Sequence, residues 1–226
     1  MEDISTALRE RRCIRRYRPD PVARELIEEI LEEARWAPSA GNTQSTYVYV
    51  VTDAALEKVK ALLVDHAERE VPPAPDIPSA PMPPYLQARM AALFKERADY
   101  VADEERRLGL TGEKASPPAA MAMARLFGAP VLLLLAADEQ NARDYGCLDA
   151  GLFAANIALA ARARGLGTCL LVSTLRASVA LHKVLPHAEG KSFIIAMTLG
   201  IPDPDAAINR FPRNRLAVEE FTTFIA

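Results

Sequence analysis

Cysteine, histidine and tryptophan are scarce in this chain of 226 residues, which has three cysteines, three histidines and one tryptophan. Cys13, Cys147 and Cys169 form no CxxC pair, and the histidines form no HExxH motif. Zinc sites depend on such spacings, so the sequence predicts no metal site. An odd, small number of cysteines is typical of reduced thiols, so we expect a cytoplasmic protein without disulfides.

Other familiar signatures are also missing. No P-loop is present, and Gly165-Leu166-Gly167 lacks the third glycine and the strand-to-helix context of a dinucleotide fingerprint. The longest apolar run, 129–137, is too short to span a bilayer, and the opening MEDISTALRERR is polar, unlike a secretory leader. A net charge of −3 argues against nucleic acid. We therefore expect neither a membrane nor a nucleic-acid partner.

Guanidinium groups, by contrast, gather at both ends of the chain. The clusters are Arg11, Arg12 and Arg15 beside Cys13, and Arg213 with Arg215. Pairing with the dipole of a helix predicted over 3–12 would account for one or two of the first group, but not for those beyond the helix end. Arginine offers a planar fork of donors that matches a phosphate or carboxylate. If the fold joins the two ends, they form a phosphate clamp.

Hydrophobic periodicity predicts helices and strands without a regular βαβ alternation, which favours an α+β fold. The helices are expected at 3–12, 26–36, 54–64, 85–107, 145–164 and 175–184, and the strands at 47–51, 130–136, 168–172 and 192–199. We predict one domain, 1–226, with a mixed four- to five-stranded sheet wrapped by helices. The centre of helix 145–164 is apolar on nearly every side, so a second copy of the chain is a natural source of cover.

Residues 65–125 differ from the rest. Seven prolines lie between Pro72 and Pro84, so that stretch is extended or irregular. A charged, alanine-rich helix follows at 85–107, and then a loop at 111–118. This excursion is either a plain connector or a lid that closes over a site, and the sequence does not decide between them.

Two motifs near the start carry a family resemblance. RRCIRRYRPDPV, followed by LIEEILEEARWAPSAGNTQ, resembles the opening of the nitroreductase family of FMN-dependent oxidoreductases. The family pattern there is Arg-Arg-Ser-x-Arg, a Pro-Val pair, a helix, and Ala-Pro-Ser-x-x-Asn-x-Gln. LDAGLFAANIALAARARGLGTCLL, LGIPD and NRFPRNRLAVEEF are similar to its later motifs. The resemblance covers 1–53 and 129–226, and the tail and the proline-bearing block look most like the nitrobenzoate-reductase-like branch.

The resemblance implies an FMN site at the arginine clusters. Arg11, Arg213 and Arg215 would hold the phosphate, with Arg12 and Cys13 beside it. Arg15 would face the pyrimidine edge, where a positive charge stabilises the anionic reduced flavin. Cys13 stands where the family has serine, and a thiol is a weaker hydrogen-bond donor than a hydroxyl.

The resemblance also assigns two loops to the flavin. The first would reach the flavin of the other subunit of a homodimer, and consists of Pro38, Ser39, Ala40, Asn42 and Gln44. Its residues are equally good chemistry for an ordinary turn. The second, at Leu171, Val172 and Ser173, would place a backbone N–H beside flavin N5.

The activity implied is an NAD(P)H-dependent FMN oxidoreductase working by a ping-pong cycle. NADH or NADPH would deliver hydride to the flavin, and an electron-poor nitroaromatic or quinone would then be reduced in the same place. No side chain is assigned as a catalytic acid or base, because the cofactor carries the chemistry. Alternatives are a flavin-binding or storage module, another family activity (flavin fragmentation, dehalogenation or enone reduction), or an anion-binding regulatory protein.

Overall fold

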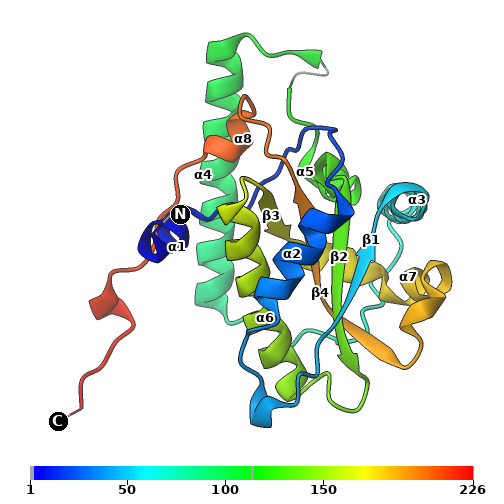
Figure 1. The fold of residues 1–226 in the computed structure, drawn as a ribbon. Coiled ribbons are helices and arrows are strands. Elements are labelled where there is room, and N and C mark those ends of the chain that lie inside the picture. The colour runs from blue at the N-terminus through cyan, green and yellow to red at the C-terminus, as the bar shows by residue number, and fades with distance from the viewer. Residues whose placement is uncertain (1–2, 113–114, 226) are drawn as a thin grey trace.

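A four-stranded sheet organises the computed structural model, which describes residues 3–112 and 115–225 (Figure 1). The strands are β1 (Tyr47–Val51), β2 (Val131–Asp138), β3 (Gly167–Leu170) and β4 (Lys191–Gly200), in the order β1-β2-β4-β3. Each pair of these strands is antiparallel. A parallel contact is added by one bridge between Cys13 and Thr168 at the β3 edge. The predicted α+β fold with four to five strands is confirmed.

Helices cover both faces of the sheet (Figure 1). One face carries α2 (Arg24–Ala34) and α6 (Tyr145–Ala163), and the other carries α3 (Asp53–Glu68), α5 (Ala119–Ala124) and α7 (Ser178–Val184). Successive side chains of a strand point to opposite faces. Leu133 therefore packs with the α2 and α6 layer, and Leu134 with the α3, α5 and α7 layer. Burial on both sides explains why β2 is a continuous apolar run.

The remaining elements are short, apart from one long helix. They are α1 (Ile4–Glu10), α4 (Pro84–Leu108), α8 (Ala207–Arg210), and the 3-10 turns η1 (Ala40–Asn42), η3 (Leu126–Gly128), η4 (Val172–Ala177), η5 (Pro186–Ala188) and η6 (Val218–Glu220). Within residues 3–112 and 115–225, no helix combines the length and apolarity needed to cross a bilayer.

Two predicted boundaries shift in ways that matter for the site. The first helix ends at Glu10, and Arg11 already has extended backbone angles, so Arg11 and Arg12 do not belong to its last turn. The helix dipole therefore does not explain them. The predicted strand 168–172 stops at Leu170, and the chain turns into η4 before α7 begins.

One side of α6 stays exposed although the helix is apolar all round. Ala154 and Ile157 are buried against the sheet, whereas Leu148, Gly151 and Ala155 lie on the exposed side. Tyr145 continues this exposed stripe with 61 % of its surface accessible. A contiguous apolar strip on a surface helix marks an interaction site more often than a solvated face.

The excursion at 65–125 is anchored to the body at both ends. At its start, the Ala74 N–H donates to the Arg176 carbonyl at 2.7 Å, and the Asp76 carboxylate accepts from His182 and from the Phe193 N–H. Later, Tyr100 on α4 meets Phe211 edge-on at 5.6 Å. Its role as a connector or a lid stays a prediction. Residues 113–114 of the predicted 111–118 loop lie outside the described residues.

Candidate functional site

The fold joins the two arginine clusters. The Arg213 guanidinium donates to the Arg9 carbonyl at 2.7 Å and also to the Arg11 carbonyl, so the C-terminal cluster lies directly on the N-terminal one. In Figure 1 the chain after α8 runs past α1, where these contacts form. Hydrogen bonds from the Arg213 side chain thus join two segments that lie about two hundred residues apart in the sequence.

The joined clusters form a concentrated positive charge. Partial burial lowers the pKa of Arg213, and the charges of Arg12, Arg215, Arg11 and Arg162 lower it further. Like charges held this close raise the free energy of the fold, and a bound anion relieves that cost. Arg162, from the last turns of α6, pairs with Glu10 at 2.6 Å. Sequence reasoning missed Arg162, although it stands three residues before the Gly165-Leu166-Gly167 segment that the family resemblance includes.

A small cavity lies among these groups. It has a volume of about 90 Å³ and is lined by Arg11, Arg12, Arg162 and the turn 165–168. Pockets that enclose whole small molecules usually measure ~300–1,000 Å³. This cavity thus suits a small charged group, such as a phosphate, rather than a complete nucleotide with three fused rings.

Gly167 permits the close packing beside that cavity. A Cβ at this position would lie 2.4 Å from Ile14 Cγ1 and 2.9 Å from Pro202 Cγ, far inside contact distance. Only a residue without a side chain lets the arginine-bearing segment pack on β3 at this point. The Ile14 N–H then donates to the Thr168 carbonyl at 2.9 Å.

Asn209 is a buried junction for the same segment. Its Oδ1 accepts from the Arg15 N–H at 2.8 Å, and its Nδ2 donates to the carbonyls of Arg16 and Asp203 at 2.8 and 2.9 Å. Arg12 also donates to its carbonyl at 2.6 Å. An amide can serve as donor and acceptor at once, which is why it fits here. Asn209 was present in the NRFPRNR motif but was not picked out as a positioning residue.

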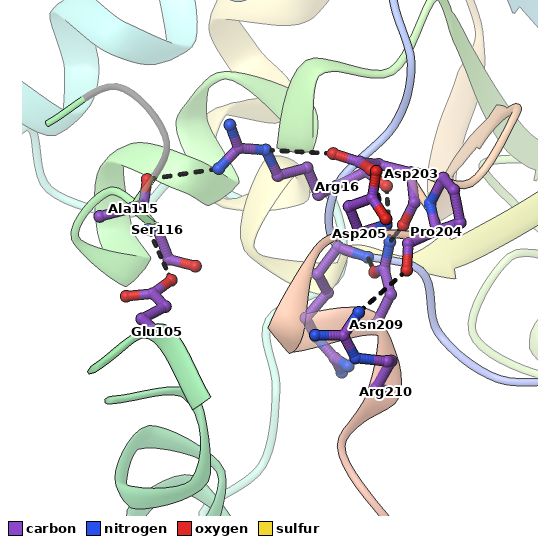
Figure 2. Close-up of polar contacts among 10 residues, drawn as sticks. Arg16, Glu105, Ala115, Ser116, Asp203, Pro204, Asp205, Asn209 and Arg210 are labelled. Carbon is purple, nitrogen blue, oxygen red and sulfur yellow. Dashed lines mark hydrogen bonds and ion pairs between the residues drawn. The ribbon is translucent and has the colours of Figure 1, made fainter. Parts of the chain in front are cut away.

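Arg16 extends this network toward the excursion (Figure 2). Its guanidinium forms a salt bridge with the Asp203 carboxylate at 3.6 Å and donates a hydrogen bond to the Ala115 carbonyl at 3.3 Å. Glu105, near the end of α4, accepts from the Ser116 N–H at 2.7 Å. The loop after α4 is therefore tied to the arginine segment by Arg16 and to α4 by Glu105.

A second positive spot lies around Arg15. Arg97 of α4 is half-buried, and burial lowers its pKa first, with the charge of Arg15 lowering it further. The Arg97 guanidinium stacks 5.0 Å from the centre of the Phe94 ring. Arg15 itself donates to the Cys13 carbonyl at 3.3 Å. Arg97 could not be found from the resemblance, because it lies in the block 65–125, where no family motif was recognised in the sequence.

Cys13 lies between the two positive spots and next to Cys169. The Cys169 thiol hydrogen-bonds to the Cys13 sulfur, which lowers the pKa of Cys13 against an opposing effect of burial; Arg15 and Arg11 lower it further. The same hydrogen bond, together with burial, raises the pKa of Cys169. Both thiols are free. The combination makes Cys13 the better nucleophile of the pair.

The loop predicted to reach another subunit is fixed by a buried acid. Asp149 on α6 accepts from the Ala40 N–H at 3.0 Å and from the Ser45 hydroxyl at 2.8 Å. Ser39 accepts from the Gln44 N–H at 2.9 Å, while Pro38, Asn42 and Gln44 are exposed. Sequence reasoning missed Asp149, and its signal was a single carboxylate in an otherwise apolar helix.

The loop and the arginine clusters do not meet within one chain. Asp149 holds the loop near the start of α6, and Arg162 lies thirteen residues further along the helix (162 − 149). At 1.5 Å per residue the two are separated by roughly 20 Å. Figure 1 shows the loop at one end of α6, and α1 with the N-terminus toward the other.

The segment predicted to lie by flavin N5 offers two backbone amides. The Leu171 N–H already donates to the Ala196 carbonyl at 2.7 Å, and its side chain is in the core. Val172 and Ser173 occupy the first turn of η4, where amides have no partner within the helix. Val172 is 67 % exposed, and the Ser173 hydroxyl faces the Met123 sulfur at 3.6 Å. Residues 172–173 are thus the better candidates.

Comparison with known proteins finds relatives along nearly the whole chain. The model of the nitroreductase family matches residues 8–201. The chain is 32 % identical to a 4-nitrobenzoate reductase of Pseudomonas putida over 230 residues, which cover 99 % of this chain and 96 % of the relative. It is 31 % identical to a chloronitrobenzene nitroreductase of Comamonas testosteroni, covering 98 % and 96 %. The crystal structure of the FMN-dependent nitroreductase NfnB from Mycobacterium smegmatis in complex with NADPH superposes with a TM-score of 0.77 at 26 % identity, covering 98 % and 97 %.

Proposed function

Because this chain belongs to the nitroreductase family, we propose that it is an FMN-dependent oxidoreductase that draws hydride from NADH or NADPH and reduces an electron-poor acceptor. The names of its relatives favour nitroaromatic acceptors, and quinones have the same electron-poor character. A ping-pong cycle suits a chain without a dinucleotide fingerprint, since donor and acceptor then use one place in turn. We also propose a cytoplasmic location, which its three free thiols support.

The observation that carries this proposal is the crowding of guanidinium groups from both chain ends. The charges of Arg11, Arg12 and Arg215 add to burial in lowering the pKa of Arg213, and the nearby acid Glu10 pairs with Arg162. A phosphate monoester brings nearly two negative charges and three acceptor oxygens. The donor set present therefore fits the phosphate of FMN in both charge and hydrogen-bonding capacity.

The other predicted contacts follow from the same placement. Arg15, with the charge of Arg97 close by, offers positive charge to the pyrimidine edge of the flavin ring. The amides of Val172 and Ser173 offer donors to the N5 side. When bound, FMN supplies a site that accepts hydride and passes electrons on, and the protein contributes position and field. No described side chain is needed as an acid or base in this scheme.

The proposal includes a homodimer, because one chain does not complete the site. The loop at 38–44 lies roughly 20 Å from the arginine clusters of its own chain. A second copy packed on the exposed stripe of α6 in the opposite direction would bring its loop to those clusters. The last residues also support a partner, since Phe224 and Ile225 are 91 % and 94 % exposed on a tail that leaves the body (Figure 1).

The test is the visible spectrum of the purified protein, followed by anaerobic mixing with NADH and, separately, NADPH. We expect a yellow protein that bleaches with a reduced nicotinamide and regains its colour with 4-nitrobenzoate or a quinone. A yellow protein that never bleaches would indicate a storage module. A colourless protein that FMN cannot reconstitute would indicate an anion-binding protein instead.

A second panel separates this function from other activities of the family. Halogenated phenols, enones and FMN under oxygen are offered to the reduced enzyme, and products are followed by chromatography. Turnover of one of these, with none of a nitroaromatic, would replace the proposed acceptor. Light scattering on the eluting protein measures its mass, and a monomer that retains FMN would contradict the shared site.

A further inference from the structure

Two of the three thiols meet across neighbouring segments of the chain. The bridge between Cys13 and Thr168 places Cys13 beside the start of β3, and Cys169 is the next residue along. The Ile14 N–H donates to the Thr168 carbonyl at 2.9 Å, which fixes this register. Paired strands lie ~5 Å apart and rise ~3.3 Å per residue, so the Cα atoms of Cys13 and Cys169 are roughly 6 Å apart, within the range that a disulfide spans. Each thiol also shifts the pKa of the other, as expected of two sulfur atoms that lie close together.

The surroundings suit oxidation of one thiol and closure by the other. Cys13 is partly exposed, and Arg11 and Arg15 stabilise its thiolate, as is typical of reactive cysteines. Tyr17 and Arg97 also face the pair, and they add no carboxylate. Cys169 is only 2 % exposed, so peroxide reaches Cys13 first, and Cys169 reacts afterwards with the oxidised Cys13 sulfur.

Cys147 provides an internal comparison. Its thiol donates to the Ala142 carbonyl at 2.9 Å, and burial raises its pKa. No arginine is among the groups that shift it. It is of similar overall exposure to Cys13 but lacks both the cationic surroundings and a neighbouring thiol.

We propose that Cys13 and Cys169 are an oxidation site, a dithiol that a hydroperoxide converts into a disulfide at the edge of the anion-binding cluster. The Cys13 thiolate attacks one peroxide oxygen, the O–O bond breaks, and Cys13 becomes a sulfenic acid as hydroxide leaves. The Cys169 sulfur then attacks the Cys13 sulfur, the S–O bond breaks, and the oxygen departs as water. With hydrogen peroxide, two thiols lose two electrons and two protons, and the peroxide becomes two molecules of water.

A bound anion should slow this oxidation. A phosphate on Arg11 and Arg12 covers the approach to Cys13 and competes with the thiolate for the same positive charge. The effect of the anion rests on the proposed function, because it takes the phosphate to be that of FMN. The formation of the disulfide does not, since it needs only the two thiols and a peroxide.

The test uses the full chain as purified, reduced and desalted without oxygen. After a short exposure to hydrogen peroxide, free thiols are alkylated, and the cysteines are mapped by peptide mass spectrometry. We expect a Cys13–Cys169 crosslink lighter by two hydrogens, formed at least about ten-fold faster than any oxidation of Cys147. Cys147→Ser should keep the crosslink. Cys169→Ser should lose it and leave a Cys13 sulfenic acid that a sulfenic-acid probe captures.

Two results would overturn the proposal. One is full alkylation of all three cysteines after peroxide, and the other is overoxidation of Cys13 without any crosslink. Cys13→Ser tests the same point from the other side, since it should leave Cys169 unreacted. Repeating the reaction with excess FMN tests the effect of a bound anion separately. Slower crosslinking supports a phosphate beside Cys13, whereas an unchanged rate removes FMN from that position and leaves the dithiol assignment intact.

Discussion

The two ends of α6 both hold charged side chains, but they differ in how those charges are satisfied. At one end the buried Asp149 carboxylate accepts from the Ala40 N–H and the Ser45 hydroxyl within its own chain. At the other end, partial burial lowers the pKa of Arg213, and the crowded neighbouring guanidinium groups lower it further. The first arrangement is complete and holds a loop in place. The second gains from an added anion, and this difference separates a structural polar site from a binding site.

Asp149→Ala should produce the largest effect, and it breaks the complete end of the comparison. The Ala40 N–H and the Ser45 hydroxyl lose a charged acceptor, at a cost of about 3 kcal/mol in the free energy of unfolding. Urea denaturation of the purified variant measures it. Asp65→Ala is the control, because Asp65 pairs with the exposed Arg69 on the surface and its loss should cost well under 1 kcal/mol. Equal losses in both variants would show that the loop does not depend on Asp149.

Arg215→Ala breaks the incomplete end. One charge-assisted contact to phosphate, about 1.5–3 kcal/mol, would weaken FMN binding roughly ten- to one hundred-fold while the free energy of unfolding stays unchanged. Titration of the stripped protein with FMN gives the dissociation constant. Arg106→Ala, on the exposed side of α4, should bind FMN normally. An unchanged dissociation constant for Arg215→Ala would remove this residue from the phosphate site.

Arg97→Gln sharpens the comparison, because Arg97 lies on α4, in the block where no family motif was recognised in the sequence. Loss of a positive charge behind Arg15 should make the two-electron potential of bound FMN more negative by roughly 30 mV, equivalent to about 1.4 kcal/mol. Anaerobic titration against a reference dye measures the potential. Arg89→Gln, exposed on the same helix, should leave it in place. Identical potentials for both variants would assign Arg97 to packing alone.

Glu33→Gln should give the smallest effect. Arg164 lies two residues after Arg162, and it forms ion pairs with Glu33 and Glu29. The hydrogen bond from Arg164 lowers the pKa of Glu33. A lowered folded pKa adds stability above the unfolded value, and this stability is lost as the pH falls through the folded pKa. The exposed pair is worth under 1 kcal/mol. Thermal unfolding should therefore distinguish variant and parent slightly at neutral pH, and not in strong acid. A difference that persists in acid would rule out the ion pair as its cause.

Local pattern sufficed for much of the fold. β2 is a long apolar run and α6 a long apolar helix, so both could be placed from the sequence, as could the two arginine clusters. The end of α1 could not, because the chain leaves the helix at Arg11 and Cys13 then pairs with Thr168 of β3, which lies far along the chain. Periodicity carries no information about that contact.

Positioning residues escaped sequence reasoning for the same reason. Asp149 acts on residues more than one hundred positions away, and Asn209 acts on Arg15 across most of the chain. Each is a single polar residue whose role depends on partners that only the fold supplies. Cys13 could be noted as a departure from the family serine, but its neighbour Cys169 appears only once β3 is in place.

The length of α6 has a thermodynamic consequence in the proposed dimer. Since a protomer keeps its loop about 20 Å from its own arginines, each cofactor must be held by two chains at once. Subunit association and cofactor retention then become linked equilibria, and each strengthens the other by the same factor. Dilution of the protein should dissociate the dimer and release FMN, with loss of the yellow colour, and added FMN should shift dissociated chains back toward the dimer.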